Sequence, residues 1–386
     1  MDNLKYWYID DENGTPEEIT IRTLNSHGVN IELFNLKNSR DFGTLKSKII
    51  ELTKEENFGG LLLDLRLDGT GDYYTSFNAT ALAQELRSVS ARGETSLYPI
   101  VLTSSMAKIK ETYNNDKTSH DLFDYKMYKS SDDWSKKSLK LNSLSDGYKI
   151  INSSFSKLPK NQGSSLEYLD GKLKVLLNKK SSEINNTRLN DKLLDLVNQE
   201  DKHLIVHFII KELFHFTIPL INKRILFAKL GLYFDEISIP DREKIYKFLE
   251  GAKYTGIFST GWDRWWNQDI DSLIQETFSI NFGLIPATQR VNLLNEYLQI
   301  NLNPSENIPY TFSNIYSTIC EATKRPIDHL EGFKVTTSHD YLPWQTPKYM
   351  SLYAILERIN RDKVTPHFSE SNRIDEEKLA LKETKD

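Results

Sequence analysis

The stretch Gly-Leu-Leu-Leu-Asp-Leu, at residues 60–65, decides the fold class of this sequence. Its apolar residues are nearly continuous, as expected of a central parallel strand that helices cover on both faces of the sheet. Strand-like and helix-like segments alternate around it over the first 130 residues, and this alternation predicts an α/β domain. The other predicted strands are residues 5–10, 30–35, 98–104 and 124–129, and the predicted helices begin at Thr15 or span residues 44–56, 78–89 and 106–114.

The composition is that of a globular protein. At about 150 residues per domain, 386 residues are enough for two to three domains. The one cysteine, Cys320, cannot form an intramolecular disulfide, and no Cys/His cluster has zinc-finger spacing. A formal charge of -5 argues against a surface dominated by nucleic-acid or membrane binding. No secretory signal or membrane-spanning run is visible, so we expect a cytoplasmic protein.

The pattern changes after residue 129, which divides the chain into four predicted parts. We expect an α/β domain at 1–135, a helix and linker at 136–166, a mostly α-helical output or interaction domain at 167–367, and a charged tail at 368–386. The third part has helical periodicity and many aromatic residues. It contains no motif that indicates a chemistry.

Four of the predicted strands end in residues that carry chemistry. Asp10 and Asp11 close the first strand, Asp64 the third, Thr103 lies near the end of the fourth, and Lys129 ends the fifth. In a doubly wound parallel sheet the ligand site lies at the carboxyl ends of the strands, so these side chains are expected to meet. Crowded carboxylates repel one another unless a cation lies among them, and Mg²⁺ prefers carboxylates, water and phosphate oxygens. An aspartate beside such a metal can form an aspartyl phosphate.

Four stretches around these residues resemble the receiver (CheY-like) domain of two-component response regulators. They are YWYIDDE at 6–12, GLLLDLRLDG at 60–69, PIVLTSS at 99–105 and FDYKMYK at 123–129. The resemblance implies a flavodoxin-like, doubly wound parallel sheet of five strands in the order 2-1-3-4-5. It also implies a Mg²⁺ site in which Asp11 ligates the metal directly, Asp10 mainly through water, Asp64 with its carboxylate and Arg66 with its backbone carbonyl.

The same resemblance implies three residues that take part in phosphoryl transfer. Asp64 would accept the phosphoryl group, Thr103 would be the switch hydroxyl, and Lys129 would pair with the phosphate. Ser130 stands after the lysine where the family usually has a proline, so Lys126 is an alternative phosphate-pairing lysine.

The spacings between the site residues are longer than the compact family pattern. The excess after Asp64 falls in residues 68–78, where a longer loop could gate the site. An aromatic switch partner on the fifth strand is either Tyr125 or Tyr128, because strand alternation does not decide between them.

Two other functions compete with phosphoryl acceptance. One is a scaffold that uses a receiver fold to bind partners without phosphotransfer. The other is a haloacid-dehalogenase-type phosphatase, because Asp11-Glu12-Asn13-Gly14-Thr15 resembles the D-x-D-G-T loop of those enzymes. In that phosphatase Asn13 replaces the second aspartate, and the presence of Asp64 has no explanation.

The resemblance therefore implies a response-regulator-like signalling protein that accepts a phosphoryl group on Asp64 from a partner histidine kinase. Because no DNA-binding motif is visible, its output would be contact with an effector protein or a phosphate-sink role. Beyond self-phosphorylation and autodephosphorylation, we expect no enzyme activity. By analogy at family level, such atypical receivers resemble regulators of phage-defence (Detocs-like) systems, and a homodimer is compatible with the resemblance.

Overall fold

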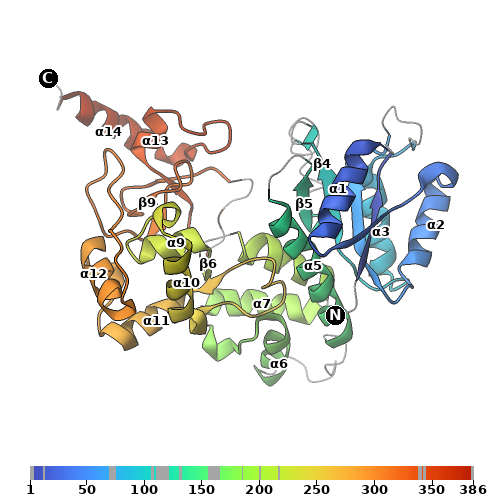
Figure 1. Cartoon of the computed structure of the whole chain (residues 1–386), viewed down its shortest axis with the longest axis horizontal. Coiled ribbons are helices and arrows are strands. Elements are labelled where there is room, and N and C mark those ends of the chain that lie inside the picture. The colour runs from blue at the N-terminus through green and yellow to red at the C-terminus, as the bar shows by residue number, and fades with distance from the viewer. Residues whose placement is uncertain are drawn as a thin grey trace. The chain divides into compact units, whose positions relative to one another are not determined.

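The structure is a computed structural model, and it forms two compact units (Figure 1). It describes residues 4–11, 14–68, 75–105, 108–109, 121–129, 133–154, 166–184, 186–199, 201–215, 218–337, 341 and 345–383. The first unit comprises residues 1–184, 190–211 and 255–262. The second unit comprises residues 185–189, 212–254 and 263–386.

A five-stranded parallel sheet lies at the centre of the first unit. Its order, β2-β1-β3-β4-β5, is the predicted flavodoxin-like order, so the fold class is confirmed. The strands are β1 (Lys5–Ile9), β2 (Asn30–Leu33), β3 (Phe58–Asp64), β4 (Ile100–Ser104) and β5 (Tyr125–Tyr128). Residues 61–63 of β3 are fully buried, because this central strand has neighbouring strands on both sides and helices on both faces.

Helices cover both faces of this sheet. Leu61 and Leu63 of β3 pack in one apolar cluster with residues of α2 and α3, and these two helices contact each other. On the other face α1 contacts α5, and the Tyr6 hydroxyl of β1 donates to the Leu141 carbonyl oxygen of α5 at 2.6 Å. The helices around the sheet are α1 (Thr15–Ser26), η1 (Leu36–Asn38), α2 (Phe42–Leu52), α3 (Ala79–Ala91) and α5 (Trp134–Ser154).

The first helix begins one residue differently from the sequence prediction. Thr15 was expected as its N-cap, but the N-cap is Gly14 and Thr15 is the first helical residue. The physical reason is the Glu17 carboxylate, which accepts the Gly14 backbone N–H at 3.2 Å and so caps the helix from its third position. Helices α2 and α3 begin at side-chain caps, Asp41 and Asn78.

Later segments of the chain belong to the same compact unit as the sheet. Trp262 packs edge-on against Tyr125 of β5, with ring centroids 6.2 Å apart, and Phe258 packs against Tyr148 of α5 at 6.4 Å. The Lys140 ammonium lies 4.6 Å from the Tyr125 ring centroid and 5.4 Å from that of Trp262. Edge strand β5 and helix α5 are therefore covered by residues far away in the sequence.

Additional helices complete this unit. The Nε2 atoms of His203 and His207 lie 3.1 Å from the carbonyl oxygen and the carboxylate of Asp121, just before β5. The segments are α6 (Leu166–Leu177), η5 (Ser181–Glu183), α7 (Thr187–Gln199), α8 (Lys202–His207) and the π-helix η6 (Phe208–Leu213), of which α7 and η6 extend into the second unit.

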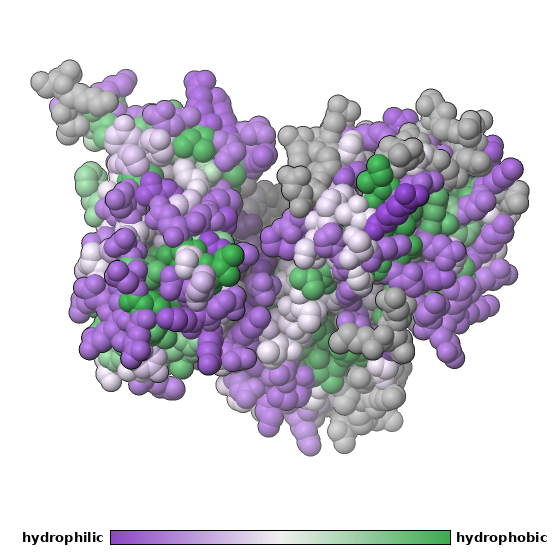
Figure 2. Space-filling view, in the orientation of Figure 1, coloured by the Kyte–Doolittle hydropathy of each residue, from purple (hydrophilic) through white to green (hydrophobic). Residues whose placement is uncertain are grey.

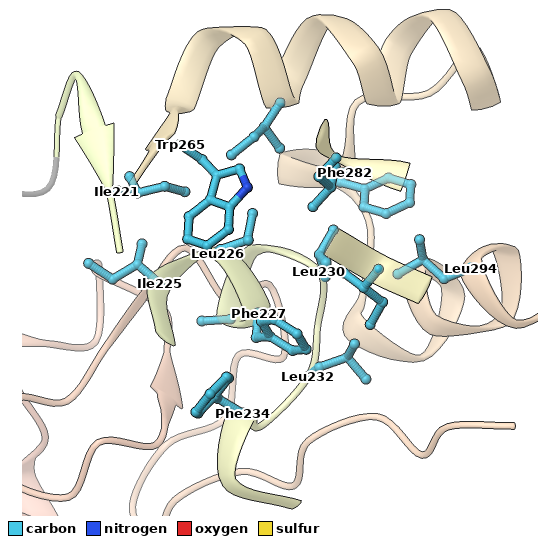
Figure 3. Close-up of a cluster of buried hydrophobic side chains, with 14 of the residues drawn as sticks. Ile221, Ile225, Leu226, Phe227, Leu230, Leu232, Phe234, Trp265, Phe282 and Leu294 are labelled. Atoms are coloured by element: carbon cyan, nitrogen blue, oxygen red, sulfur yellow. The ribbon is translucent and has the colours of Figure 1, made fainter. Parts of the chain in front are cut away.

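The second unit is mostly helical, as the sequence predicts. One apolar cluster of this unit gathers Trp265, Phe227 and Phe282 from separate segments (Figure 3). Its helices are α9 (Lys223–Lys229), η7 (Phe234–Glu236), α10 (Ile239–Phe248), η8 (Glu250–Ala252), α11 (Asn267–Phe278), η9 (Phe282–Leu284), α12 (Ala287–Leu298), α13 (Leu352–Leu356), η10 (Phe368–Glu370) and α14 (Ser371–Glu383). In the part of the unit that the structure describes, three antiparallel pairs of two-residue strands accompany them: β6 (Leu220–Ile221) with β7 (Trp265–Trp266), β8 (Thr318–Ile319) with β9 (Pro326–Ile327), and β10 (Phe333–Lys334) with β11 (Tyr349–Met350).

The predicted linker and tail are described in part. Residues 155–165, which hold the predicted linker, and most of the predicted helix at 106–114 lie outside the described residues. The segment predicted as a charged tail forms η10 and α14, and Ile374 of α14 is buried in an apolar cluster.

The visible face of both units is mostly hydrophilic, with smaller hydrophobic areas (Figure 2). Among the described residues, no helix combines the length and the hydrophobicity that a membrane span needs.

The close packing of Phe258 on α5 predicts an unusual effect of a glycine substitution. A Cβ atom at Gly147 of α5 would overlap the ring of Phe258 at Cε1, so Gly147→Ala should destabilise the first unit by about 1–3 kcal/mol. Helix propensity alone predicts the opposite sign. Urea unfolding of Gly147→Ala and of Gly251→Ala, which meets nothing within 4 Å, measures the difference. A Gly147→Ala protein as stable as the parent would contradict this packing.

Candidate functional site

Three aspartates meet at the carboxyl ends of the central strands. Asp10 and Asp11 follow β1, and Asp64 is the last residue of β3, which pairs with β1 in parallel. One carboxylate oxygen from each residue lies within 4.8 Å of the others. All three residues are at most 3% exposed, so their charges are not screened by bulk water. The fold thus brings together the three carboxylates that the sequence predicted as metal ligands.

Lys129 is the cation that the structure places among these carboxylates. It directly follows β5, and its ammonium lies 2.8 Å from Asp10 Oδ2 and 2.9 Å from Asp64 Oδ1. A third carboxylate oxygen, Glu17 Oε1, lies 3.4 Å away. The Lys129 side chain is 22% exposed, so one side of the ammonium remains close to solvent.

Of the two candidate lysines, Lys129 lies beside the aspartates. The ion pairs with Asp10 and Asp64 are made by Lys129. Burial, and next the charge of Lys211, lower the pKa of Lys126 to about 8, so Lys126 lies near another lysine. Ser130, which follows Lys129, lies outside the described residues.

Thr103 lies beside Asp64 in the sheet. The two residues are paired in the parallel register of β3 and β4, and Thr103 is 1% exposed. Its hydroxyl donates to the Leu63 carbonyl oxygen at 3.3 Å. Arg66 contributes its backbone N–H, which donates to Asp64 Oδ2 at 2.9 Å. The predicted role of the Arg66 carbonyl in the metal shell remains a prediction.

The two candidate aromatic residues of β5 face different surroundings. Tyr125 contacts Trp262 and Lys140, whereas Tyr128 packs against the apolar cluster that contains α2 and α3. The two tyrosines therefore have different neighbours, which strand alternation alone did not predict.

Sequence reasoning missed two residues of the site, Glu17 and Tyr8. Glu17 is 2% exposed and lies in the first turn of α1, where its carboxylate contacts both Gly14 and Lys129. The Tyr8 hydroxyl donates to Asp10 Oδ2 at 2.6 Å. Tyr8 lies two residues before Asp10 and therefore on the same side of the strand, which was a usable signal. The sequence signal for Glu17 was weaker, because acidic residues are common in the first turn of a helix.

The predicted gating loop is described only at its two ends. Thr75 donates its backbone N–H to the Leu67 carbonyl oxygen at 2.7 Å and its hydroxyl to the Phe77 carbonyl oxygen at 2.6 Å. The ends of the insertion therefore lie close together. Residues 69–74 between them lie outside the described residues.

The pKa values of Asp64 and Lys129 are both raised by their surroundings. Burial, and next the charge of Asp10, raise the pKa of Asp64 to about 6, although Lys129 opposes this rise. Burial acts against the charge of Lys129, but Tyr8, Asp64 and Asp10 outweigh it and raise the pKa of this lysine. Lys129 therefore stays charged at neutral pH, and Asp64 ionises near neutrality.

The donor set suits a hard divalent cation. Asp10, Asp11 and Asp64 offer carboxylate oxygens, which are the ligands that Mg²⁺ prefers. Lys129 balances only part of their charge, and a second cation would lower the repulsion among the three. Such a site, with a carboxylate, a hydroxyl and an ammonium side by side, has the groups needed to accept a phosphoryl group.

Comparisons with known proteins do not assign a family. No protein-family model matches the chain, and no curated protein matches it. Among solved structures, a sensor protein from Polaromonas sp. JS666 is 14% identical over 38% of this chain and 98% of its own, with a TM-score of 0.27. An adenylate cyclase from Rhodopirellula baltica is 14% identical over 40% of this chain and 96% of its own, with a TM-score of 0.28. At this level neither likeness bears on activity.

The raised pKa of Asp64 predicts a pH-dependent affinity for Mg²⁺. Below pH 6 the metal must displace the proton of Asp64, so the affinity should rise about tenfold per pH unit and level off above pH 6. Without metal, the free energy of unfolding should instead fall as the pH rises. The raised pKa of Asp64 stabilises the fold at low pH, and this contribution is lost as the pH rises through 6. Calorimetric titration with MgCl₂ from pH 5 to 8 measures the affinity. A flat profile would be evidence against Asp64 as a ligand, and Asp64→Asn should remove the dependence.

Removing the ammonium should destabilise the site unless a metal replaces it. Lys129→Met leaves buried carboxylates without their cation, which should lower the unfolding free energy by about 3 kcal/mol. Added MgCl₂ should restore part of this loss. Thermal unfolding with and without MgCl₂ checks both effects, and Lys136→Met, whose side chain is 63% exposed, is the control. Equal stability of Lys129→Met and the parent would refute the electrostatic role.

Proposed function

We propose that the first unit is a receiver-like phosphoacceptor domain in which Asp64 receives a phosphoryl group from a partner histidine kinase in the presence of Mg²⁺. The observation that carries the proposal is the convergence of Asp10, Asp11 and Asp64 with Lys129 at 2.9 Å from Asp64 Oδ1. The haloacid-dehalogenase-type alternative is less well supported, because it assigns no role to Asp64.

Each residue of the site has a task in this reaction. A carboxylate oxygen of Asp64 forms the new O–P bond while the P–N bond of the phosphohistidine donor breaks, and the imidazole leaves with the electron pair of that bond. Asp10, Asp11 and Asp64 would hold the magnesium ion, whose charge offsets that of the phosphoryl oxygens. Lys129, which pairs with Asp64, would pair with the aspartyl phosphate, and Thr103, beside Asp64 on the neighbouring strand, would donate its hydroxyl to it.

The proposed consequence is a change of contacts rather than of chemistry. A phosphoryl group adds negative charge next to Lys129, at the end of β5, and α5 follows a few residues later. The partners proposed are the kinase and an effector protein that contacts the helical part of the chain, or no effector if the domain is a phosphate sink. A cytoplasmic location and a role in phage defence belong to the same proposal.

Intact mass spectrometry with a small phosphodonor tests the proposal. After incubation with acetyl phosphate and MgCl₂ we expect a single phosphoryl adduct that is stable to acid and labile to base. Asp64→Asn should abolish it. Asp68→Asn, the same change at an aspartate whose side chain is 45% exposed, should leave it intact, and EDTA should prevent it. If the parent protein forms no adduct, phosphotransfer is refuted and the scaffold function replaces it.

A further inference from the structure

Glu17 is a buried acid of the site that is not one of the three converging aspartates. Its carboxylate has one described contact on each oxygen. Oε2 accepts the Gly14 N–H at 3.2 Å, and Oε1 accepts from the Lys129 ammonium at 3.4 Å. The side chain is 3% exposed, so bulk water screens its charge little. Glu17 therefore connects the first turn of α1 to the lysine at the end of β5.

The three carboxylates around Lys129 match the capacity of its ammonium. A lysine ammonium has three N–H donors, and Asp10, Asp64 and Glu17 each place one oxygen within 3.4 Å. Asp10 and Asp64 belong to the metal cluster, and Glu17 does not. A cation bound by these aspartates would weaken their attraction for Lys129, since like charges repel. Glu17 is then the carboxylate that continues to hold the lysine.

We propose that Glu17 is a positioning residue: it holds the Lys129 ammonium beside Asp64 when a metal ion competes for Asp10 and Asp64 and the phosphoryl group is transferred to Asp64. This inference rests on the proposed phosphoacceptor function. It adds a residue that the sequence pattern of the site did not include. Because Glu17 touches neither the metal cluster nor Asp64 in the described contacts, it acts through Lys129.

The test compares Glu17→Gln with Glu18→Gln. Glutamine keeps an oxygen that can accept the Gly14 N–H, so the cap of α1 is retained while the charge toward Lys129 is lost. Glu18, one residue further, has an exposed side chain paired with Arg22, and its substitution is the matched control. With acetyl phosphate and MgCl₂, the initial rate of adduct formation should fall about tenfold in Glu17→Gln and stay unchanged in Glu18→Gln.

A double-mutant cycle with Lys129→Met shows whether Glu17 acts through the lysine, and it needs no phosphodonor. Urea unfolding measures by what factor Lys129→Met increases the unfolding constant. This factor should be at least about fivefold smaller when Glu17 is already glutamine. An additive cycle overturns the proposal, and so does an unchanged rate in Glu17→Gln. If the parent protein forms no adduct, the proposed function fails, and the cycle alone decides whether Glu17 holds Lys129.

Discussion

The candidate site depends on the Lys129 ammonium that lies among buried carboxylates. Without a cation, the buried carboxylates of Asp10, Asp11 and Asp64 would repel one another, because their oxygens lie within 4.8 Å of one another. Lys129 provides one positive charge at 2.8 Å from Asp10 and 2.9 Å from Asp64. This partial compensation leaves room for a second cation. The site is thus stable enough to form and still negative enough to bind a metal.

The parallel sheet is what makes this arrangement possible. Strands β1, β3, β4 and β5 run in the same direction, so the residues that end them lie at one edge. The register pairs Asp64 with Thr103, and the β4–β5 pairing places Lys129 one residue beyond Tyr128, the partner of Ser104. Residues separated by more than a hundred positions in the sequence thereby meet within hydrogen-bond distance.

The first unit is more than a sheet with its covering helices. Phe258 and Trp262 pack on α5 and β5, and His203 and His207 contact the turn before β5. These contacts cover the edge of the sheet from which Lys129 emerges. Lys129 directly follows β5, so a change in its position would move β5 and α5. Such a movement would change their contacts with these distant segments of the chain.

The sequence by itself determined the α/β class of the first 130 residues and the residues that end the strands. These predictions rest on local features of the sequence: the apolar run at 60–65, the alternation of strand and helix periodicity, and the acids after the first and third strands. Such features can be recognised without knowing how the chain packs. Only the tertiary structure decided that Lys129 reaches the aspartates and that Glu17 contacts this lysine. Each of these depends on where a side chain ends in space relative to residues far along the chain, and strand or helix periodicity carries no information about such distances.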